Sequence, residues 1–307
     1  DMLEDGKTYR LLSDGNTQNV FQFSSPGITR FIQDVQPECI EDLIAINALY
    51  RPATLDIGAT DDYVCFRRGE VVPVYNYGCY EATKNTFGIM VYQEQFMSVA
   101  HTLGGFDLGK TDYLRKAIGK KKADLMATLK ADFIAGAVGN GCPDYEAEEI
   151  WHKIEVAGKY SFNRSHAAAY ALTAYCGAWF KANYPSAFYT VALQWADDKE
   201  IPSLMAEMER CSSAKIVPPD INRSGTEFFT DYATDEIFWS LTRIKQVGVK
   251  TVEYIVTERD RGGAYTGIEN FIHRIFRYKL KKYSYWDDPD NAEEAVKVPV
   301  NARHVKH

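Results

Sequence analysis

The stretch Gly158-Lys159-Tyr160-Ser161-Phe162-Asn163-Arg164-Ser165-His166 leads directly into a run of small residues, Ala167-Ala168-Ala169-Tyr170-Ala171. Ser165 is a favoured helix N-cap and alanine has the highest helix propensity, so we predict a helix that begins here and runs to about Asn183. A helix start offers unpaired N–H groups and the positive end of the helix dipole. Donor side chains crowd around this start, namely Lys159, Asn163, Arg164 and His166. The pattern is typical of a phosphate-binding helix start; the alternative is an ordinary core helix whose first turn is merely solvated.

The composition is that of a globular protein. The chain has 307 residues, enough for two domains, and 46% of them are hydrophobic while 25% are charged. These proportions exclude disordered and collagen-like chains. No apolar run approaches the length of a membrane span, and residues 1–5 lack the basic and apolar regions of a signal peptide. We therefore expect no membrane partner and no export by a signal of the chain's own.

The cysteines are widely spaced, and none of them forms a C-x-x-C pair or lies near a pair of histidines. They are Cys39, Cys65, Cys79, Cys142, Cys176 and Cys211. This spacing predicts reduced thiols in a cytoplasmic protein and no metal site.

Charge is unevenly distributed along the chain, although the formal net charge is only -7. One basic block comprises Lys110, Arg115, Lys116, Lys120, Lys121 and Lys122. A second comprises Arg274, Arg277, Lys279, Lys281 and Lys282, and an acidic tract at 287–294 follows it. Each block is either a phosphate-binding face or a solvated surface, and the acidic tract is able to neutralise the second block.

Hydrophobic periodicity predicts few elements before residue 86. Val20–Phe23 is typical of a short strand, and the apolar positions of Ile40–Leu49 predict a helix that Arg51-Pro52 ends. Residues 53–78 are rich in Gly, Asp, Tyr and Val without a clean period, which indicates a loop with room for a hairpin.

From residue 86 to about 211 the chain is predicted to be almost entirely helical. The first helix spans Thr86–Leu103 and stops at Gly104-Gly105. Besides the helix at Ser165, further helices are predicted to begin at Thr111 or Asp112, at Lys122, at Pro143, after Tyr184-Pro185 and after Ile201-Pro202.

The composition changes again after residue 214. Lys215–Asn222 is predicted to be extended because each proline disfavours helix at the residue before it. Strands are predicted at Glu227–Tyr232 and Glu236–Ser240, and a helix, turn and helix over Leu241–Arg259. The turn Val247-Gly248-Val249, followed by Lys250, resembles a helix-hairpin-helix that presents backbone N–H groups to a nucleic-acid phosphate. The usual motif has two glycines, and Gln246 replaces the first; an ordinary helical hairpin is the alternative.

Together these segments resemble the family of bacterial DNA polymerase III alpha subunits, the C-family replicative polymerases. The resemblance rests on short strings that occur in the family's order: Asn16–Gln22, Glu41–Ala45, Ala48–Pro52, Gly88–Gln95, Leu114–Lys122, Tyr160–Tyr170 and Pro218–Asn222. It implies a mainly α fold, with a helical fingers domain over residues 1–200 and a smaller helix-hairpin-helix region with a few short strands over 201–307.

The function that the resemblance implies is DNA-directed DNA synthesis during replication. The expected partners are primer–template DNA and a deoxynucleoside triphosphate (dNTP), with the sliding clamp and other replisome subunits bound through other regions, in a nucleoid-associated protein. The family uses Mg²⁺ held by carboxylates of a palm domain that precedes this segment. We therefore expect no catalytic residue here and no activity of the isolated chain.

The resemblance also implies roles for individual residues. Arg115 and Lys116 line the triphosphate, and Tyr160, Asn163 and His166 lie near the incoming nucleotide. DNA contacts are implied for Lys120, Lys121, Lys122, Arg164 and the hairpin residues Val247, Gly248, Val249 and Lys250.

Three features depart from the family pattern. Lys116 replaces a second arginine and lacks its bidentate fork, Ala53-Thr54 replace a glycine and a proline, and residues 278–298 have no counterpart. Two alternatives remain. The first is a DNA-binding module without chemistry, and the second is a self-contained nucleotide enzyme that uses Glu94, Asp107 or Asp112 as metal ligands.

Overall fold

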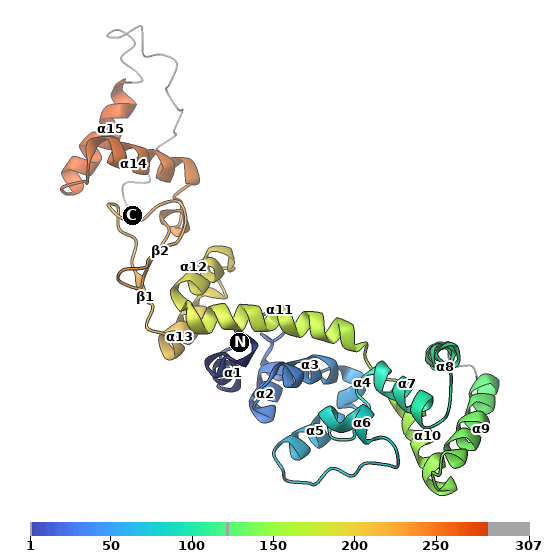
Figure 1. Cartoon of the computed structure of the whole chain (residues 1–307). Coiled ribbons are helices and arrows are strands. Elements are labelled where there is room, and N and C mark those ends of the chain that lie inside the picture. Colours follow the sequence, from blue (N-terminus) through green and yellow to red (C-terminus); the bar gives the residue numbers. More distant parts are fainter. Residues whose placement is uncertain (1, 121–122, 282–307) are drawn as a thin grey trace. The chain divides into compact units, whose positions relative to one another are not determined.

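The computed structural model describes residues 2–120 and 123–281, which divide into two compact units between Asn183 and Tyr184. Both units are mainly helical, and only the second contains named strands among the described residues (Figure 1). The predicted mainly α fold with a few short strands is therefore confirmed. The assignment of residues 1–200 to one fingers domain remains a prediction, and the compact units divide before that boundary.

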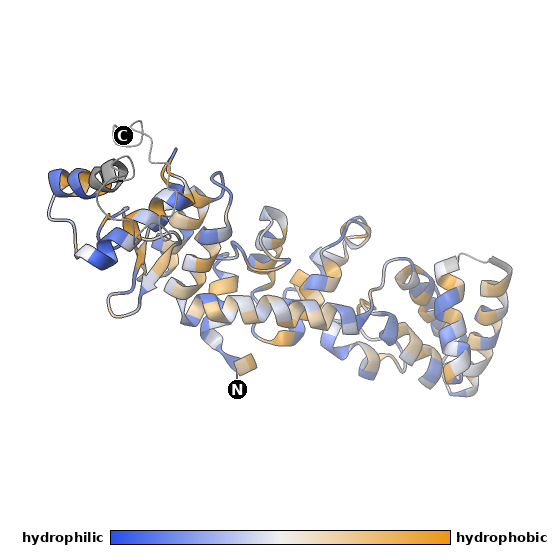
Figure 2. Cartoon of the chain, turned by 90° about the horizontal axis from the view of Figure 1, so that it is seen from above, coloured by the Kyte–Doolittle hydropathy of each residue, from blue (hydrophilic) through white to orange (hydrophobic). Residues whose placement is uncertain are grey.

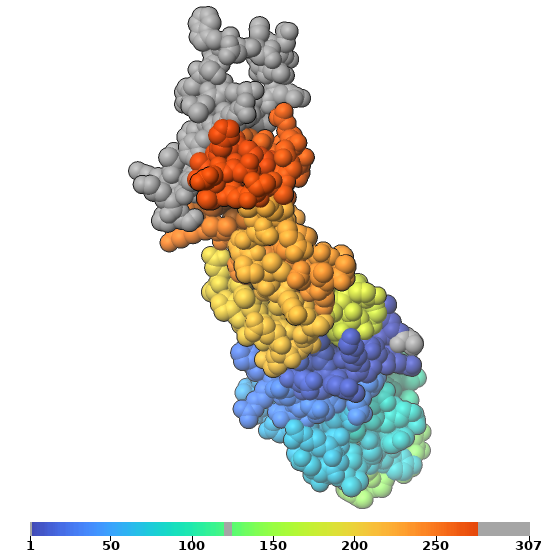
Figure 3. Space-filling view, turned by 90° about the vertical axis from the view of Figure 1, so that its left-hand side faces the viewer, coloured from blue at the N-terminus to red at the C-terminus, as the bar shows by residue number. Residues whose placement is uncertain are grey.

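The first unit is organised around the long helix α11 (Arg164–Asn183). Helices α1 (Gly6–Ser13) and α3 (Ile40–Leu49) pack along it (Figure 1). Its buried face is built largely from alanines, which let the neighbouring backbones approach closely, and α11 is pale in the hydropathy colouring along most of its length (Figure 2). The space-filling view shows the blue N-terminal residues beside the yellow-green α11 (Figure 3). The remaining elements here are η1 (Met2–Glu4), α2 (Pro26–Val35), α4 (Pro52–Leu55), α5 (Ala59–Arg67), α6 (Tyr80–Thr83) and η2 (Lys84–Thr86).

A second core of the same unit is formed by four helices around the buried side chains of Phe96, Phe133 and Trp151. The helices are α7 (Gln93–Thr102), α8 (Leu108–Lys120), α9 (Ala123–Gly139) and α10 (Asp144–Gly158). Glycine permits the closest contact, because a Cβ at Gly136 of α9 would overlap the carbonyl of Gly104.

The two cores meet where the chain enters and leaves the four-helix segment. Tyr92 and Phe162 form an isolated parallel β-bridge just before α7 and α11. The N–H of Gln93 donates to the carbonyl of Phe162 at 2.9 Å, and the N–H of Phe162 donates to the carbonyl of Val91 at 2.9 Å. The starts of α7 and α11 therefore lie side by side.

The second unit contains a small sheet with strand order β1-β3-β2. Its strands are β1 (Lys215–Val217), β2 (Phe229–Asp231) and β3 (Glu236–Phe238); β1 is parallel and β2 antiparallel to β3. Helix α12 (Pro185–Trp195) packs on β2, β3 and α13 (Ile201–Cys211). The rest of the unit comprises η3 (Leu241–Arg243), α14 (Val249–Gly262) and α15 (Ile268–Lys281).

Arg243 fixes the start of the hairpin region to the end of α12. Its Nη2 donates to the carbonyls of Gln194 at 2.7 Å and Ala196 at 3.1 Å. These carbonyls lie at the helix C-terminus, where a cation is favoured by the helix dipole.

Most of the predicted helices and strands are confirmed. Helix α3 has the predicted bounds Ile40–Leu49, α11 ends at Asn183, and α10, α12 and α13 begin within two residues of the predicted positions. The strands predicted at Glu227–Tyr232 and Glu236–Ser240 correspond to β2 and β3, and the extended segment contains β1.

Two predictions for the N-terminal region are wrong. Val20–Phe23 forms turns rather than a strand; Gln22 has a φ of 62° and no neighbouring strand is present among the described residues. Residues 53–78 contain α4 and α5 rather than a hairpin. The buried hydroxyl of Thr54 donates to the carbonyl of Leu49 at the end of α3, a bond that a proline at this position does not make.

Other predicted helix starts were displaced by local backbone geometry. The helix predicted from Thr86 begins only at Gln93, because Phe87 and Gly88 have positive φ values and Tyr92 joins the β-bridge. Helix α8 begins at Leu108 rather than at Thr111 or Asp112, and the N–H of Lys110 donates to Asp107 Oδ1 at 2.7 Å. The first helix predicted within Leu241–Arg259 is only the short 3-10 helix η3.

Candidate functional site

The start of α11 is capped by Asn163, not by Ser165. The helix begins at Arg164, and Asn163 Oδ1 accepts a hydrogen bond from the N–H of His166 at 2.9 Å. This is the usual reach of an N-cap side chain to the third helical residue. The predicted cap is therefore wrong by two residues, whereas the predicted helix is confirmed.

The other donors at this helix start face a carboxylate from α7. Glu94 accepts from the N–H of Arg164 at 3.0 Å through Oε2 and from Asn163 Nδ2 at 2.8 Å through Oε1. Two of the donors at this helix start thus bind an anion within the chain itself, and part of the pattern that indicated a phosphate site serves this contact.

Arg164 also forms an ion pair with α3. Its Nη2 lies 2.7 Å from Glu41 Oε1 and 2.8 Å from Oε2, and the hydrogen bond to Glu41 raises the pKa of Arg164 above its ordinary value. Its predicted DNA contact is not tested by these bonds, but any phosphate must compete with Glu41 for the guanidinium.

A pocket of about 310 Å³ opens beside the first turns of α11. Its lining combines aromatic rings with polar side chains: Gln22, Ser25, Ile28, Asn47, Tyr50, Arg51, Phe162, His166 and Tyr170. The His166 ring lies 4.2 Å from that of Tyr170 and 5.3 Å from that of Phe162, measured between centroids. Of the residues that the sequence assigned to the nucleotide, His166 is the one that lines this pocket.

Arg51 is a pocket residue that the sequence analysis did not assign to the nucleotide. Its guanidinium lies 4.4 Å from the centroid of Phe162, and its Nη2 donates to the carbonyl of Tyr160 at 2.7 Å. Burial lowers the pKa of Arg51 from its ordinary value. In the sequence, Arg51 was marked only by its position in the string Ala48–Pro52.

Two positive side chains of α8, those of Arg115 and Lys116, are paired with an acid of the same helix. Arg115 Nη2 lies 2.7 Å from Asp112 Oδ1, and Lys116 Nζ lies 2.6 Å from Asp112 Oδ2. Hydrogen bonds from Lys116, which has the larger effect, and from Arg115 hold the pKa of Asp112 below its usual range. All three side chains are at least one-third exposed, so a stronger anion has access to both cations.

The structure brings some of the predicted nucleotide residues together. Tyr160 packs against the same core as α8, and Gly158 leaves room for Ile118 of that helix. Burial raises the pKa of the Tyr160 phenol. Within the described contacts, none joins Arg115 or Lys116 directly to Asn163 or His166. Lys120 ends α8, whereas Lys121 and Lys122 lie outside the described residues.

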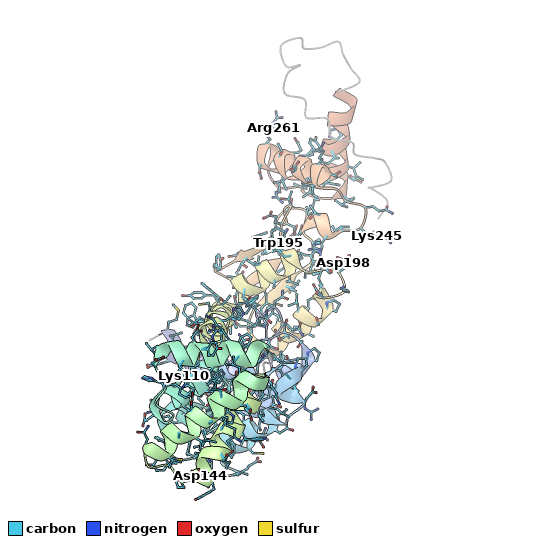
Figure 4. All side chains as sticks on the ribbon, turned by 90° about the vertical axis from the view of Figure 1, so that its right-hand side faces the viewer. Lys110, Asp144, Trp195, Asp198, Lys245 and Arg261 are labelled. Atoms are coloured by element: carbon cyan, nitrogen blue, oxygen red, sulfur yellow. The ribbon has the colours of Figure 1, made fainter. Side chains whose placement is uncertain are left out.

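The hairpin of the second unit presents backbone donors to solvent. Gly248 is the N-cap of α14, and the N–H groups of Gly248, Val249 and Lys250 make no hydrogen bond to another described residue. The N–H of Val247 is already used, because it donates to the carbonyl of Ile244 at 3.0 Å. Lys245 lies just before this turn and Arg261 near the end of α14 (Figure 4).

The three carboxylates considered as metal ligands serve different structural contacts. Glu94 binds the start of α11, Asp107 binds the start of α8, and Asp112 binds Arg115 and Lys116. Across residues 2–120 and 123–281 no group of three His, Cys, Asp or Glu side chains could hold a metal ion. These residues therefore do not fit a shared magnesium site. Over the same two ranges, no helix has the length and apolarity that a membrane span requires.

Comparison with known families gives two matches. Residues 2–141 match the model of the bacterial DNA polymerase III alpha subunit finger domain, and residues 213–285 match a helix-hairpin-helix motif.

Relatives among characterised proteins cover most of the chain. It is 39% identical to DNA polymerase III subunit alpha of Aquifex aeolicus, over 91% of this chain and 24% of the relative. The corresponding protein of Borreliella burgdorferi is 40% identical over 88% of this chain, and that of Pseudomonas aeruginosa 38% identical over 91%; each is covered over 24% of its own length. The chain thus spans about a quarter of the curated relatives it matches.

Proposed function

Because this chain belongs, as a segment, to the family of bacterial DNA polymerase III alpha subunits, we propose that it forms the nucleotide-facing and DNA-facing part of a DNA-directed DNA polymerase. The observation that carries the proposal is the pocket beside the first turns of α11, which contains His166 of the family string Tyr160–Tyr170. The segment's task is to hold the incoming dNTP in line with the primer end, so that a mismatched base pair is misaligned for reaction.

The pocket suits a nucleoside because it combines flat rings with hydrogen-bonding side chains. Phe162, His166 and Tyr170 offer ring surfaces, and Asn47 and Ser25 offer polar groups. Arg115 and Lys116 supply positive charge for the triphosphate and exchange their contact with Asp112 for a phosphate. Because the carboxylates described above do not fit a shared metal site, the Mg²⁺ of polymerisation is assigned to other parts of the polymerase.

Titration of a fluorescent dATP analogue with this chain tests the nucleotide role. We expect Arg115→Ala and His166→Ala to weaken binding by about tenfold each, the typical loss for one removed charge or stacking contact. Lys130→Ala is the matched control, because Lys130 is a similarly exposed cation that forms an ion pair with Glu148 at 2.6 Å. Equal loss in all three variants would contradict the assignment.

If the chain alone holds no nucleotide, the same variants belong in a full-length polymerase. There Arg115→Ala is expected to raise the KM for dNTP while leaving the Kd for primer–template DNA nearly unchanged. Loss of both in the same proportion would contradict the role of Arg115.

DNA contact is proposed for the hairpin and for the basic end of α8. The free N–H groups of Gly248, Val249 and Lys250 are suited to one phosphate, with Lys245 and Lys250 as neighbouring charges. Lys120, Lys121, Lys122 and Arg164 are proposed to follow the DNA backbone as well. The sliding clamp, the other replisome subunits and a nucleoid location are proposed for the whole polymerase and not for this segment alone.

Fluorescence anisotropy of a primer–template duplex across a salt series tests this DNA binding. Lys250→Glu, and a combined reversal of Lys120, Lys121 and Lys122, are each expected to reduce the salt slope, by about 0.9 for each phosphate that the variant no longer neutralises. Lys199→Glu is the control because Lys199 is highly exposed and lies away from the hairpin sequence. If DNA binds but dNTP never does, even in the full-length polymerase, the DNA-binding module without chemistry becomes the better description.

A further inference from the structure

Two helix starts with the same polarity lie side by side in the first unit. The parallel β-bridge joins Tyr92, which directly precedes α7, to Phe162, which lies two residues before the start of α11 at Arg164. Both starts carry the positive end of a helix dipole and unpaired N–H groups. An anion between them stabilises the positive dipole ends of both helices and accepts hydrogen bonds from their N–H groups.

Glu94 is placed to supply that anion. It is the second residue of α7, and the backbone N–H of the N-cap residue Tyr92 is bound by its neighbour Gln95, whose Oε1 accepts at 2.8 Å. The carboxylate of Glu94 is therefore available to α11, where it accepts from the N–H of Arg164 and from Asn163 Nδ2. The partners lie 69 and 70 residues away in the sequence.

We propose that Glu94 is a positioning residue that fixes the first turn of α11 and thereby the direction in which His166 enters the pocket. Two hydrogen bonds connect Glu94 to the backbone of His166 through the side-chain amide of Asn163. Glu94 orients the amide of Asn163 through Nδ2, and Oδ1 of the same amide accepts from the N–H of His166 at 2.9 Å. The consequence for nucleotide binding rests on the proposed function, whereas the effect on the helix start does not.

The conservative variant separates charge from shape. In Glu94→Gln one oxygen still accepts a hydrogen bond, but the amide nitrogen cannot, so the Arg164 N–H and Asn163 Nδ2 compete for a single acceptor. In Glu94→Ala neither donor has this acceptor. The ion pair of Arg164 with Glu41 remains in both variants and preserves the packing of α11 on α3.

Amide hydrogen exchange on the 307-residue chain tests the structural step. We expect exchange at the Arg164 and His166 amides to accelerate by about tenfold in Glu94→Ala and by less in Glu94→Gln. Added sulfate is expected to restore protection in Glu94→Ala alone, because it replaces the missing carboxylate at the helix start. Glu81→Gln is the control, since Glu81 is exposed and forms an ion pair with Lys84 at i+3.

The same dATP-analogue titration then tests the functional step. If the unsubstituted chain binds the analogue, Glu94→Gln is expected to weaken binding several-fold while leaving the circular dichroism spectrum unchanged. Unchanged Arg164 and His166 exchange in Glu94→Ala overturns the inference, as does unchanged affinity in both variants. If no form of the chain binds the analogue, the affinity comparison is made in the full-length polymerase, whereas hydrogen exchange in the chain decides whether Glu94 positions α11.

Discussion

Asp112 occupies both of the positive side chains that the family resemblance assigns to the triphosphate. Its pKa lies below the usual range because Lys116 and Arg115 hydrogen-bond to the ionised carboxylate. The folded state therefore favours the charged form, and this contact contributes stability above the ordinary carboxyl pKa. The contribution is lost as the pH falls through the lowered pKa.

Replacing Lys116 tests this relation. In Lys116→Ala we expect the pKa of Asp112 to rise toward its ordinary value, because the stronger of its two hydrogen bonds is removed while that of Arg115 remains. An NMR titration of the Asp112 carboxyl group measures the shift. The matched control is Lys130→Ala, which removes an exposed lysine from a different carboxylate, Glu148. An unchanged Asp112 titration would show that Arg115 alone sets it.

The hairpin has its left-handed residue at a position without glycine. Gln246 has a φ of 70°, whereas Gly248 has a φ of -86° and open space around its Cβ position. A non-glycine residue in the left-handed region destabilises the folded state by about 1 kcal/mol. Glycine avoids this backbone strain, although its greater conformational entropy in the unfolded chain offsets part of the gain.

We therefore predict that Gln246→Gly stabilises the chain by up to about 1 kcal/mol. Urea denaturation measures this as a higher midpoint with an unchanged slope. Gly248→Ala, whose backbone and surroundings accept a methyl group, is expected to be close to neutral in the absence of DNA. A lower midpoint for Gln246→Gly would mean that the glutamine side chain contributes more than its backbone strain costs.

At the residue level, the stretch Gly158–Ala171 located the start of α11 but not the side chains that surround this start. Asn163, Arg164 and His166 were found from their clustering beside an alanine run. Their partners could not be found in this way, because Glu41 lies 123 residues from Arg164 and Glu94 lies 70. Local patterns contain no information about such distant pairs; the packing of α3 against α11 and the β-bridge between Tyr92 and Phe162 bring them together.

Among the elements, α9 depends most directly on glycine for its packing. A Cβ at Gly136 would overlap the backbone of Gly104, which cannot move away as a flexible side chain would. We predict that Gly136→Ala destabilises the chain by about 1–3 kcal/mol, the usual cost of overpacking. Chemical denaturation measures the loss.

Gly139 in the same helix provides the control for Gly136. It is exposed, with open space around its Cβ position. Gly139→Ala is therefore expected to be neutral or to stabilise by up to about 1 kcal/mol, because alanine favours helix over glycine. A similar loss in both variants would point to a general effect of the extra methyl group and not to the contact with Gly104.

Elements with a clear apolar period were predicted well, and those set by backbone geometry were not. Ile40–Leu49 has its full pattern within ten residues and was predicted with the observed bounds. Residues 53–78 have no such pattern, so α4 and α5 were missed. The start of α7 was misplaced because the β-bridge with Phe162 depends on a segment far along the chain.

For the molecule as a whole, each compact unit has hydrophobic cores of its own. Residues such as Tyr175 and Trp151 build the cores of the first unit, and Tyr189 and Val252 those of the second. We therefore expect two thermal transitions in differential scanning calorimetry. Gly136→Ala should lower one of them and Gln246→Gly should raise the other. A single transition moved by both substitutions would contradict independent unfolding of the units.

The β-bridge between Tyr92 and Phe162 also has a consequence for inheritance and engineering. Helices α7 to α10 form a segment whose two ends are held together by the two hydrogen bonds of this bridge. Most of the segment's core is built from its own side chains. Such a segment has the topology of an inserted cassette, because its ends already meet in space. It could be lengthened, shortened or exchanged between relatives while the rest of the unit keeps its path, provided that the two bridging residues and the carboxylate beside them are retained.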